Sequence, residues 1–160
     1  MGSLVRGMEE REYQTRIART ALERNTLVCL PTGLGKTNIA VLVAARRLEA
    51  FPGSRILLLA PTKPLVHQHL SSFRKFLSLD PSSLAAVTGE LPPEKRRGLY
   101  HSTLIFATPQ TVQKDLEHGT VSLSSFSLLV IDELHHAVGK YAYPFVAKRF
   151  LKESRQPRIL

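Results

Sequence analysis

Residues 30–37, Leu-Pro-Thr-Gly-Leu-Gly-Lys-Thr, restrict the possible fold of this chain more than any other stretch. They follow a short apolar run, Thr26–Leu30, and precede a helical pattern, Asn38–Leu48. A strand, a glycine-rich loop and a helix in this order are typical of a P-loop, because glycines let backbone N–H groups turn toward phosphate oxygens and the helix N-terminus adds its positive dipole. A dinucleotide-binding loop is excluded, because Asn38 stands where that motif needs its third glycine.

A second motif supplies acidic residues for the same site. The apolar run Ser127–Ile131 ends in Asp132 and Glu133. We expect Lys36 to reach the β- and γ-phosphates, and Thr37 and Asp132 to hold the accompanying Mg²⁺. Side chains alternate along a strand, so Glu133 points the other way and can orient and deprotonate the water that attacks the γ-phosphate. The two motifs together predict a site for a nucleotide and Mg²⁺.

Short apolar runs alternate with helical patterns along the chain. The runs are nearly continuous, which is typical of strands that are covered on both faces of a parallel sheet. This order predicts an α/β fold, a mostly parallel sheet with helices on both faces. The expected strands are Thr26–Leu30, Arg55–Ala60, Leu84–Thr88, Thr103–Ala107 and Ser127–Ile131, and the expected helices include Glu9–Arg24, Asn38–Leu48 and Tyr143–Leu151.

The charge balance points to an acidic partner. The 160 residues include 22 lysines and arginines against 13 aspartates and glutamates, which gives a formal net charge of +9. Nucleic acid is the first acidic partner to consider, although a merely basic surface would give the same balance. The single cysteine, Cys29, excludes an intramolecular disulfide, and its apolar neighbours favour a buried, unreactive thiol.

The two ends of the chain suggest its boundaries. Residues 1–8 are mixed in character and predict a flexible tail before one domain over residues 9–160. Arg158–Leu160 resembles the start of another strand, so we expect a fragment of a longer protein. No run has the length of a transmembrane helix and no secretory segment is evident. We therefore expect an intracellular protein without a membrane partner, cytoplasmic if prokaryotic and nuclear if eukaryotic.

The two nucleotide motifs resemble those of superfamily 2 helicases, many of which also lack the first P-loop glycine that Leu30 replaces here. Residues 132–135, Asp-Glu-Leu-His, are similar to their DExH box, and residues 11–14 are similar to the upstream motif whose glutamine recognises adenine. The resemblance implies a RecA-like P-loop domain with ATP and Mg²⁺ as cofactors. It implies ATP binding by Arg11, Gln14, Pro31, Thr32, Gly33, Leu34, Gly35, Lys36 and Thr37, metal binding by Thr37 and Asp132, and catalytic roles for Lys36, Asp132, Glu133 and His135.

Three further segments match positions that touch the nucleic-acid backbone in these helicases. Each follows an expected strand, so we expect all three to lie along one edge of the sheet. Such contacts position a nucleic-acid strand without reading its sequence. The residues are Pro61, Thr62, Lys63, Gln68, Thr88, Gly89, Thr108 and Pro109. Among the basic clusters, we expect Lys95, Arg96 and Arg97 to contact the backbone.

Residues 132–143 narrow the resemblance to the Hef/FANCM branch, whose members remodel forked and branched DNA. The ending Ala-x-Gly-x-Tyr-Ala-Tyr is similar to that branch, whereas Leu134 and His136 depart from it, and the His-His-Ala variant resembles Dicer and RIG-I-like RNA helicases. Three functions stay open: the motor domain of a DNA helicase or translocase, an RNA helicase of the Dicer/RIG-I type, or a non-catalytic binding module with a vestigial P-loop. Because the family hydrolyses ATP between two RecA-like domains, we expect a second domain of the same protein as partner and little turnover by this chain alone.

Overall fold

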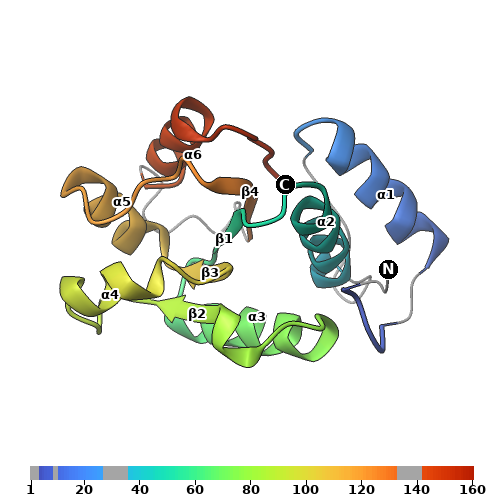
Figure 1. Cartoon of the computed structure of the whole chain (residues 1–160), viewed down its shortest axis with the longest axis horizontal. Coiled ribbons are helices and arrows are strands. Elements are labelled where there is room, and N and C mark those ends of the chain that lie inside the picture. Colours follow the sequence, from blue (N-terminus) through green and yellow to red (C-terminus); the bar gives the residue numbers. More distant parts are fainter. Residues whose placement is uncertain (1–3, 9–10, 27–35, 133–141) are drawn as a thin grey trace.

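A sheet of four parallel strands lies at the centre of the computed structural model, which describes residues 4–8, 11–26, 36–132 and 142–160 (Figure 1). The order across the sheet is β2 (Leu84–Val87), β3 (Leu104–Ala107), β1 (Arg55–Leu59) and β4 (Phe126–Ile131). Every pairing is parallel. These strands confirm four expected ones to within a residue at either end. The fifth, Thr26–Leu30, falls outside the described residues except for Thr26.

Helices cover both faces of the sheet, as the continuous apolar strands predict (Figure 1). The helices α1 (Glu12–Glu23), α2 (Lys36–Ala50) and α3 (Lys63–Phe76) pack on one face, and α4 (Pro93–Leu99), α5 (Pro109–Glu117) and α6 (Ala142–Glu153) pack on the other. Successive strand residues alternate between the two layers, with Ile56 and Leu58 in the first and Leu57 and Leu59 in the second. The predicted α/β fold is therefore confirmed. None of the helices in the described ranges is both long and apolar enough to cross a bilayer.

The connections orient the helices relative to the sheet. α3 and α5 begin within a few residues of the ends of β1 and β3, and each carries proline in its first turn, where the missing N–H is tolerated. The Thr62 hydroxyl caps α3 by accepting a hydrogen bond from the Leu65 N–H at 3.4 Å. Between α2 and β1 the chain turns at Gly53, whose φ of 83° favours glycine. This turn places the end of α2 at the amino edge of the sheet, so its first residue, Lys36, lies toward the carboxyl edge.

The segment Arg158–Leu160, whose sequence predicts the start of another strand, lies beside β4. Leu129 of β4 donates a backbone hydrogen bond to this segment at 2.8 Å and accepts one from it at 2.9 Å. On the other side, the Thr26 N–H donates to the Ile159 carbonyl at 3.1 Å. The segment therefore sits between β4 and the stretch of chain that leads toward the predicted P-loop, and it extends the parallel sheet.

Residues 4–8, which fall within the tail expected over residues 1–8, contact the end of α3. Val5 forms an antiparallel bridge with Leu77, and the Arg6 N–H donates to the Phe76 carbonyl at 2.8 Å. The apolar side chains of the segment also pack against the core on the α2–α3 face; they are Leu4, Val5 and Met8. The end of α3 thus offers this segment both backbone hydrogen-bonding groups and apolar surface. Residues 4–8 therefore belong to the packed structure.

Candidate nucleotide and nucleic-acid site

Three of the predicted site residues, Lys36, Thr37 and Asp132, lie toward the carboxyl edge of the sheet. Asp132 directly follows β4, and its N–H donates to the carbonyl of Leu59, the last residue of β1, at 2.9 Å. In the first turn of α2, Lys36 is exposed and Thr37 is half-buried. The described ranges do not include Cys29, Pro31, Thr32, Gly33, Leu34, Gly35, Glu133 or His135, so the roles assigned to these residues stay predictions.

The surroundings of Asp132 suit a magnesium ion. Its main chain is held by the bond to Leu59 and by the Tyr143 hydroxyl, which donates to the Asp132 carbonyl at 3.4 Å. Protein sites for Mg²⁺ usually supply one or two oxygen ligands and leave the others to phosphates and water. The Asp132 carboxylate and the Thr37 hydroxyl are ligands of that kind. Within the described ranges, no group of three or more His, Cys, Asp or Glu side chains gathers as a metal site.

Asp132 has a partner that the sequence pattern does not reveal. The Nε2 atom of His69, on α3, lies 2.6 Å from Oδ2 of Asp132. Because a carboxylate can only accept, the ring nitrogen is the donor. The two residues are 63 positions apart and no recognised motif links them. Only the folded chain brings them together.

Gln14, the predicted adenine-recognition residue, is 2% exposed in α1. Its Oε1 atom accepts a hydrogen bond from the Arg11 N–H at 3.2 Å, so the side chain helps to cap the helix that it belongs to. An amide oxygen has two lone pairs and can accept a second hydrogen bond. The capping contact is therefore compatible with adenine recognition, which stays a prediction for Gln14 and Arg11.

The expected nucleic-acid residues differ in how accessible their side chains are. Thr62, Lys63, Gln68 and Gly89 are exposed, and Lys63 forms an ion pair with Glu90 that joins the start of α3 to the turn after β2. Pro61 is half-buried. The residues at these positions can contact a nucleic-acid backbone that runs along the carboxyl edge of the sheet.

The side chains of Thr88 and Pro109 are buried, so they do not make the direct side-chain contact with nucleic acid that we expected. Both follow strands at points where the chain turns back over the sheet, so their side chains pack inward. Thr108 is half-buried, and its hydroxyl lies 2.8 Å from that of Thr111. Thr88 and Pro109 can therefore contact the nucleic-acid backbone only through main-chain atoms of the protein.

The expected nucleic-acid contact by Lys95, Arg96 and Arg97 is wrong for Arg96. Its side chain is 9% exposed, and it donates to both carboxylate oxygens of Asp115, with Nη2–Oδ1 at 2.6 Å and Nε–Oδ2 at 2.9 Å. A third bond, from Nη1, reaches the Leu91 carbonyl at 2.5 Å. The hydrogen bonds to Asp115 raise the pKa of Arg96 above its ordinary value. Arg96 therefore fixes the turn after β2, while Lys95 and Arg97 stay exposed.

Tyr100→Phe is expected to reveal a pH-dependent contribution to stability. Burial raises the pKa of Tyr100, and its 2.6 Å hydrogen bond to Oδ2 of Asp115 raises it further. A raised tyrosine pKa means that the stabilisation is complete below the unfolded pKa of about 10 and declines as pH rises above it. Near neutral pH the variant should lose about 1.5–3 kcal/mol of unfolding free energy, because the acceptor is charged. Urea denaturation from neutral to alkaline pH tests this, and a difference between variant and wild type that does not shrink above about pH 10 contradicts it.

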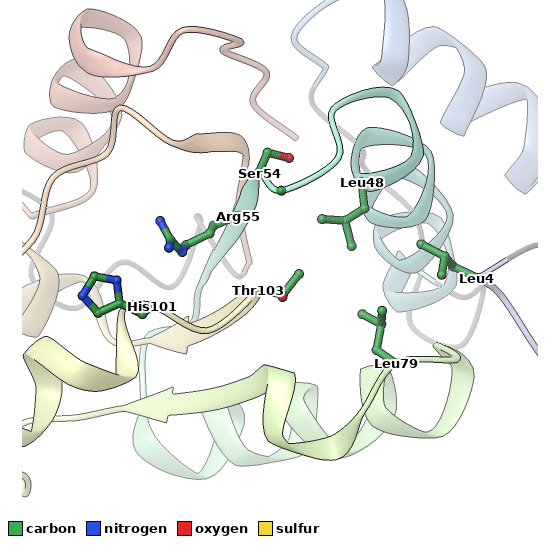
Figure 2. Close-up of a pocket in the computed structure, with 8 residues that line it drawn as sticks. Leu4, Leu48, Ser54, Arg55, Leu79, His101 and Thr103 are labelled. Carbon is green, nitrogen blue, oxygen red and sulfur yellow. The ribbon is translucent and has the colours of Figure 1, made fainter.

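A pocket of about 270 Å³ lies at the opposite, amino edge of the sheet (Figure 2). Leu4, Leu48 and Leu79 line one side of it, and Arg55 and His101 lie toward the other. Since Arg55 is the first residue of β1, this pocket is separated from Asp132 by the length of the strands. It therefore plays no part in the nucleotide site.

Residues 11–159 match the DEAD/DEAH box helicase family. A solved structure, the helicase domain of Pyrococcus furiosus Hef, is 44% identical and superimposes with a TM-score of 0.91, covering 98% of this chain and 33% of that one. This match confirms the RecA-like arrangement and the expected resemblance to Hef.

Curated relatives agree with the family match. A Methanocaldococcus jannaschii protein provisionally named an ATP-dependent RNA helicase is 46% identical over 89% of this chain, and the ATP-dependent DNA helicase fml1 of Schizosaccharomyces pombe is 42% identical over 94% of it. The chain spans 18% of the length of each of these two relatives.

Proposed function

Because the chain belongs to the DEAD/DEAH box helicase family, we propose that it is the first RecA-like domain of an ATP-dependent helicase or translocase that acts on forked or branched DNA. The observation that supports this most is the position of Asp132 at the end of β4, on the carboxyl edge of the sheet. Lys36, at the start of α2, lies toward the same edge. A parallel α/β sheet binds its ligands at this carboxyl edge. This position supports a nucleotide site that includes Lys36, Thr37 and Asp132.

In this function, each residue of the site has a separate task. Lys36 holds the β- and γ-phosphates and offsets the charge that develops on them. Thr37 and Asp132 hold Mg²⁺, which neutralises phosphate charge when bound. Glu133 orients and deprotonates the attacking water, and His135 relates the state of the γ-phosphate to the partner domain. Gln14 and Arg11 recognise adenine.

The nucleic-acid backbone would run along the same edge. Thr62, Lys63 and Gly89 offer exposed donors there, and none of them reads a base. The family resemblance to Hef and the name of the yeast relative favour DNA as the substrate. The name of the archaeal relative, together with the His135–His136 variant, keeps RNA as a second candidate.

Forked-DNA binding measured over a range of salt concentrations tests the proposed nucleic-acid edge. Contacts between lysine or arginine and phosphates release counterions, so the affinity should fall steeply as salt increases. Competition between forked DNA and double-stranded RNA at one salt concentration then separates the two substrates. A binding curve that is flat from low to moderate salt contradicts a backbone-tracking function.

Glu90→Gln is expected to raise the affinity for forked DNA by about two- to fivefold, since an exposed ion pair is worth up to about 1 kcal/mol. The change frees Lys63 from its ion pair and removes a negative charge beside the path of the phosphates. Fluorescence anisotropy at low salt measures the effect. Glu117→Gln, at an exposed position near the end of α5, is the matched control because it changes the net charge equally. An equal gain in both variants would mean that only overall charge matters.

The resemblance also implies that a second RecA-like domain of the same protein completes ATP hydrolysis. An arginine finger supplied by such a domain can accelerate hydrolysis by about 10³-fold or more. We therefore expect this chain to bind Mg·ATP and to turn it over very slowly. Robust hydrolysis by the pure monomer, abolished by Lys36→Ala, would contradict this expectation. An absence of nucleotide binding would instead favour the non-catalytic binding module.

A further inference from the structure

His69 belongs to none of the predicted nucleotide motifs, yet its imidazole meets the carboxylate of Asp132. The 2.6 Å contact is short, and the two side chains are only 13% and 21% exposed. A charge-assisted hydrogen bond that is shielded from water holds its geometry better than an exposed pair does. The contact therefore constrains the direction in which the Asp132 carboxylate points.

The main chain of Asp132 is fixed by its neighbours, but its carboxylate is not fixed by them. The Asp132 N–H donates to the Leu59 carbonyl and the Asp132 carbonyl accepts from the Tyr143 hydroxyl, so both bonds involve only backbone atoms of Asp132. Rotation about the side-chain bonds would still move both carboxylate oxygens. The hydrogen bond from His69 to Oδ2 limits that rotation and leaves Oδ1 free of this bond. A carboxylate with one oxygen held in this way keeps lone pairs for a metal ion or a metal-bound water.

The position of His69 on α3 gives it access to this carboxylate. Val66, Leu70 and Phe73 form the buried face of the helix, and His69 lies beside that face. His67, two residues earlier, is exposed on the opposite side. The same helix therefore carries one histidine that contacts Asp132 and another that faces solvent. Substituting each of them in turn gives a test variant and its control.

We propose that His69 is a positioning residue that orients Asp132 for the metal ion accompanying the bound nucleotide. The proposal rests on the function proposed above, because it requires Asp132 to be a metal ligand. Hydrogen-bond donors behind metal-binding carboxylates commonly change metal affinity by 10- to 100-fold when they are removed. His69 would thus raise the affinity for the metal without touching the nucleotide.

Electron paramagnetic resonance of Mn²⁺, titrated into the 160-residue chain with saturating ADP, measures this effect directly. His69→Ala should weaken Mn²⁺ binding by about tenfold or more. His69→Gln should recover much of the affinity, because its amide can donate from nearly the same place as Nε2. His67→Ala should behave as wild type. Without metal, the ADP affinity of His69→Ala should match that of wild type, which separates positioning of the metal ligand from damage to the nucleotide site.

The possible results distinguish this inference from the function on which it rests. Wild-type affinity for Mn²⁺ in His69→Ala would overturn the role of His69 while leaving the proposed nucleotide site intact. Tighter binding in that variant would also overturn it, because His69 would then compete with the metal for Asp132. An equal loss in His67→Ala would show a general effect of altering α3. If the wild-type chain binds no Mn·ADP, the proposed function fails and the role of His69 fails with it.

Discussion

Lys36→Ala is expected to weaken binding of Mg·ADP by roughly 10- to 150-fold. The estimate takes the hydrogen bonds of a charged group to phosphate as worth about 1.5–3 kcal/mol. Lys36 is exposed, so its removal should leave the free energy of unfolding nearly unchanged. Isothermal titration calorimetry measures the affinity, and urea denaturation without nucleotide checks the fold.

Lys152→Ala is the control for the loss of one positive charge. Lys152 is exposed in the last turn of α6, which packs on the other face of the sheet from α2. We expect this variant to bind nucleotide as wild type does. Equal affinities in wild type and Lys36→Ala would mean that the chain does not bind phosphates through its P-loop.

Asp115→Ala is expected to lower the free energy of unfolding by about 3–5 kcal/mol, because it leaves the buried charge of Arg96 without a counter-ion. The Tyr100 hydroxyl loses its acceptor in the same variant. Asp115→Asn should have a smaller effect, since the amide keeps the shape and one accepting oxygen. Urea denaturation of the wild type and the two variants measures the series.

Glu49→Gln is the matched control for Asp115→Ala, because Glu49 pairs with Arg46 on the surface of α2. Breaking such an exposed pair should change stability by less than about 1 kcal/mol. If Asp115→Ala were as mild as this control, the cluster of Arg96, Tyr100 and Asp115 would not hold α4 to α5. Arg96 also donates a hydrogen bond to the Leu91 carbonyl in the turn after β2, and other contacts would then have to hold this turn in place.

The strands, their parallel arrangement and the position of Asp132 could be predicted from the sequence because their signals are local. A continuous apolar run that ends in acidic residues predicts a buried strand and the acids at its end from only a few neighbouring positions. The strand-like character of Arg158–Leu160 was predictable for the same reason, whereas its pairing with β4 was not predicted. These features did not depend on knowing how the helices pack.

The contacts of His69 and Arg96 were not predictable because they depend on packing between distant segments. His69 contacts Asp132 across 63 positions, and only the folding of the chain brings the two together. Arg96 stands in a basic run where its neighbours are exposed, and the sequence does not mark which side chain turns inward toward Asp115. The contacts of Leu4 and Val5 likewise depend on the end of α3 lying beside them.

The thermal midpoint of the wild-type chain, measured with increasing ADP in the presence of Mg²⁺ and again with a chelator, tests the central claim most directly. A ligand that binds only the folded state adds about 2.7 kcal/mol of stability at a hundredfold excess over its dissociation constant. We predict a midpoint that rises with ADP and rises further when Mg²⁺ is present, because Thr37 and Asp132 then engage the metal. A midpoint that stays unchanged up to millimolar Mg·ADP would contradict the account.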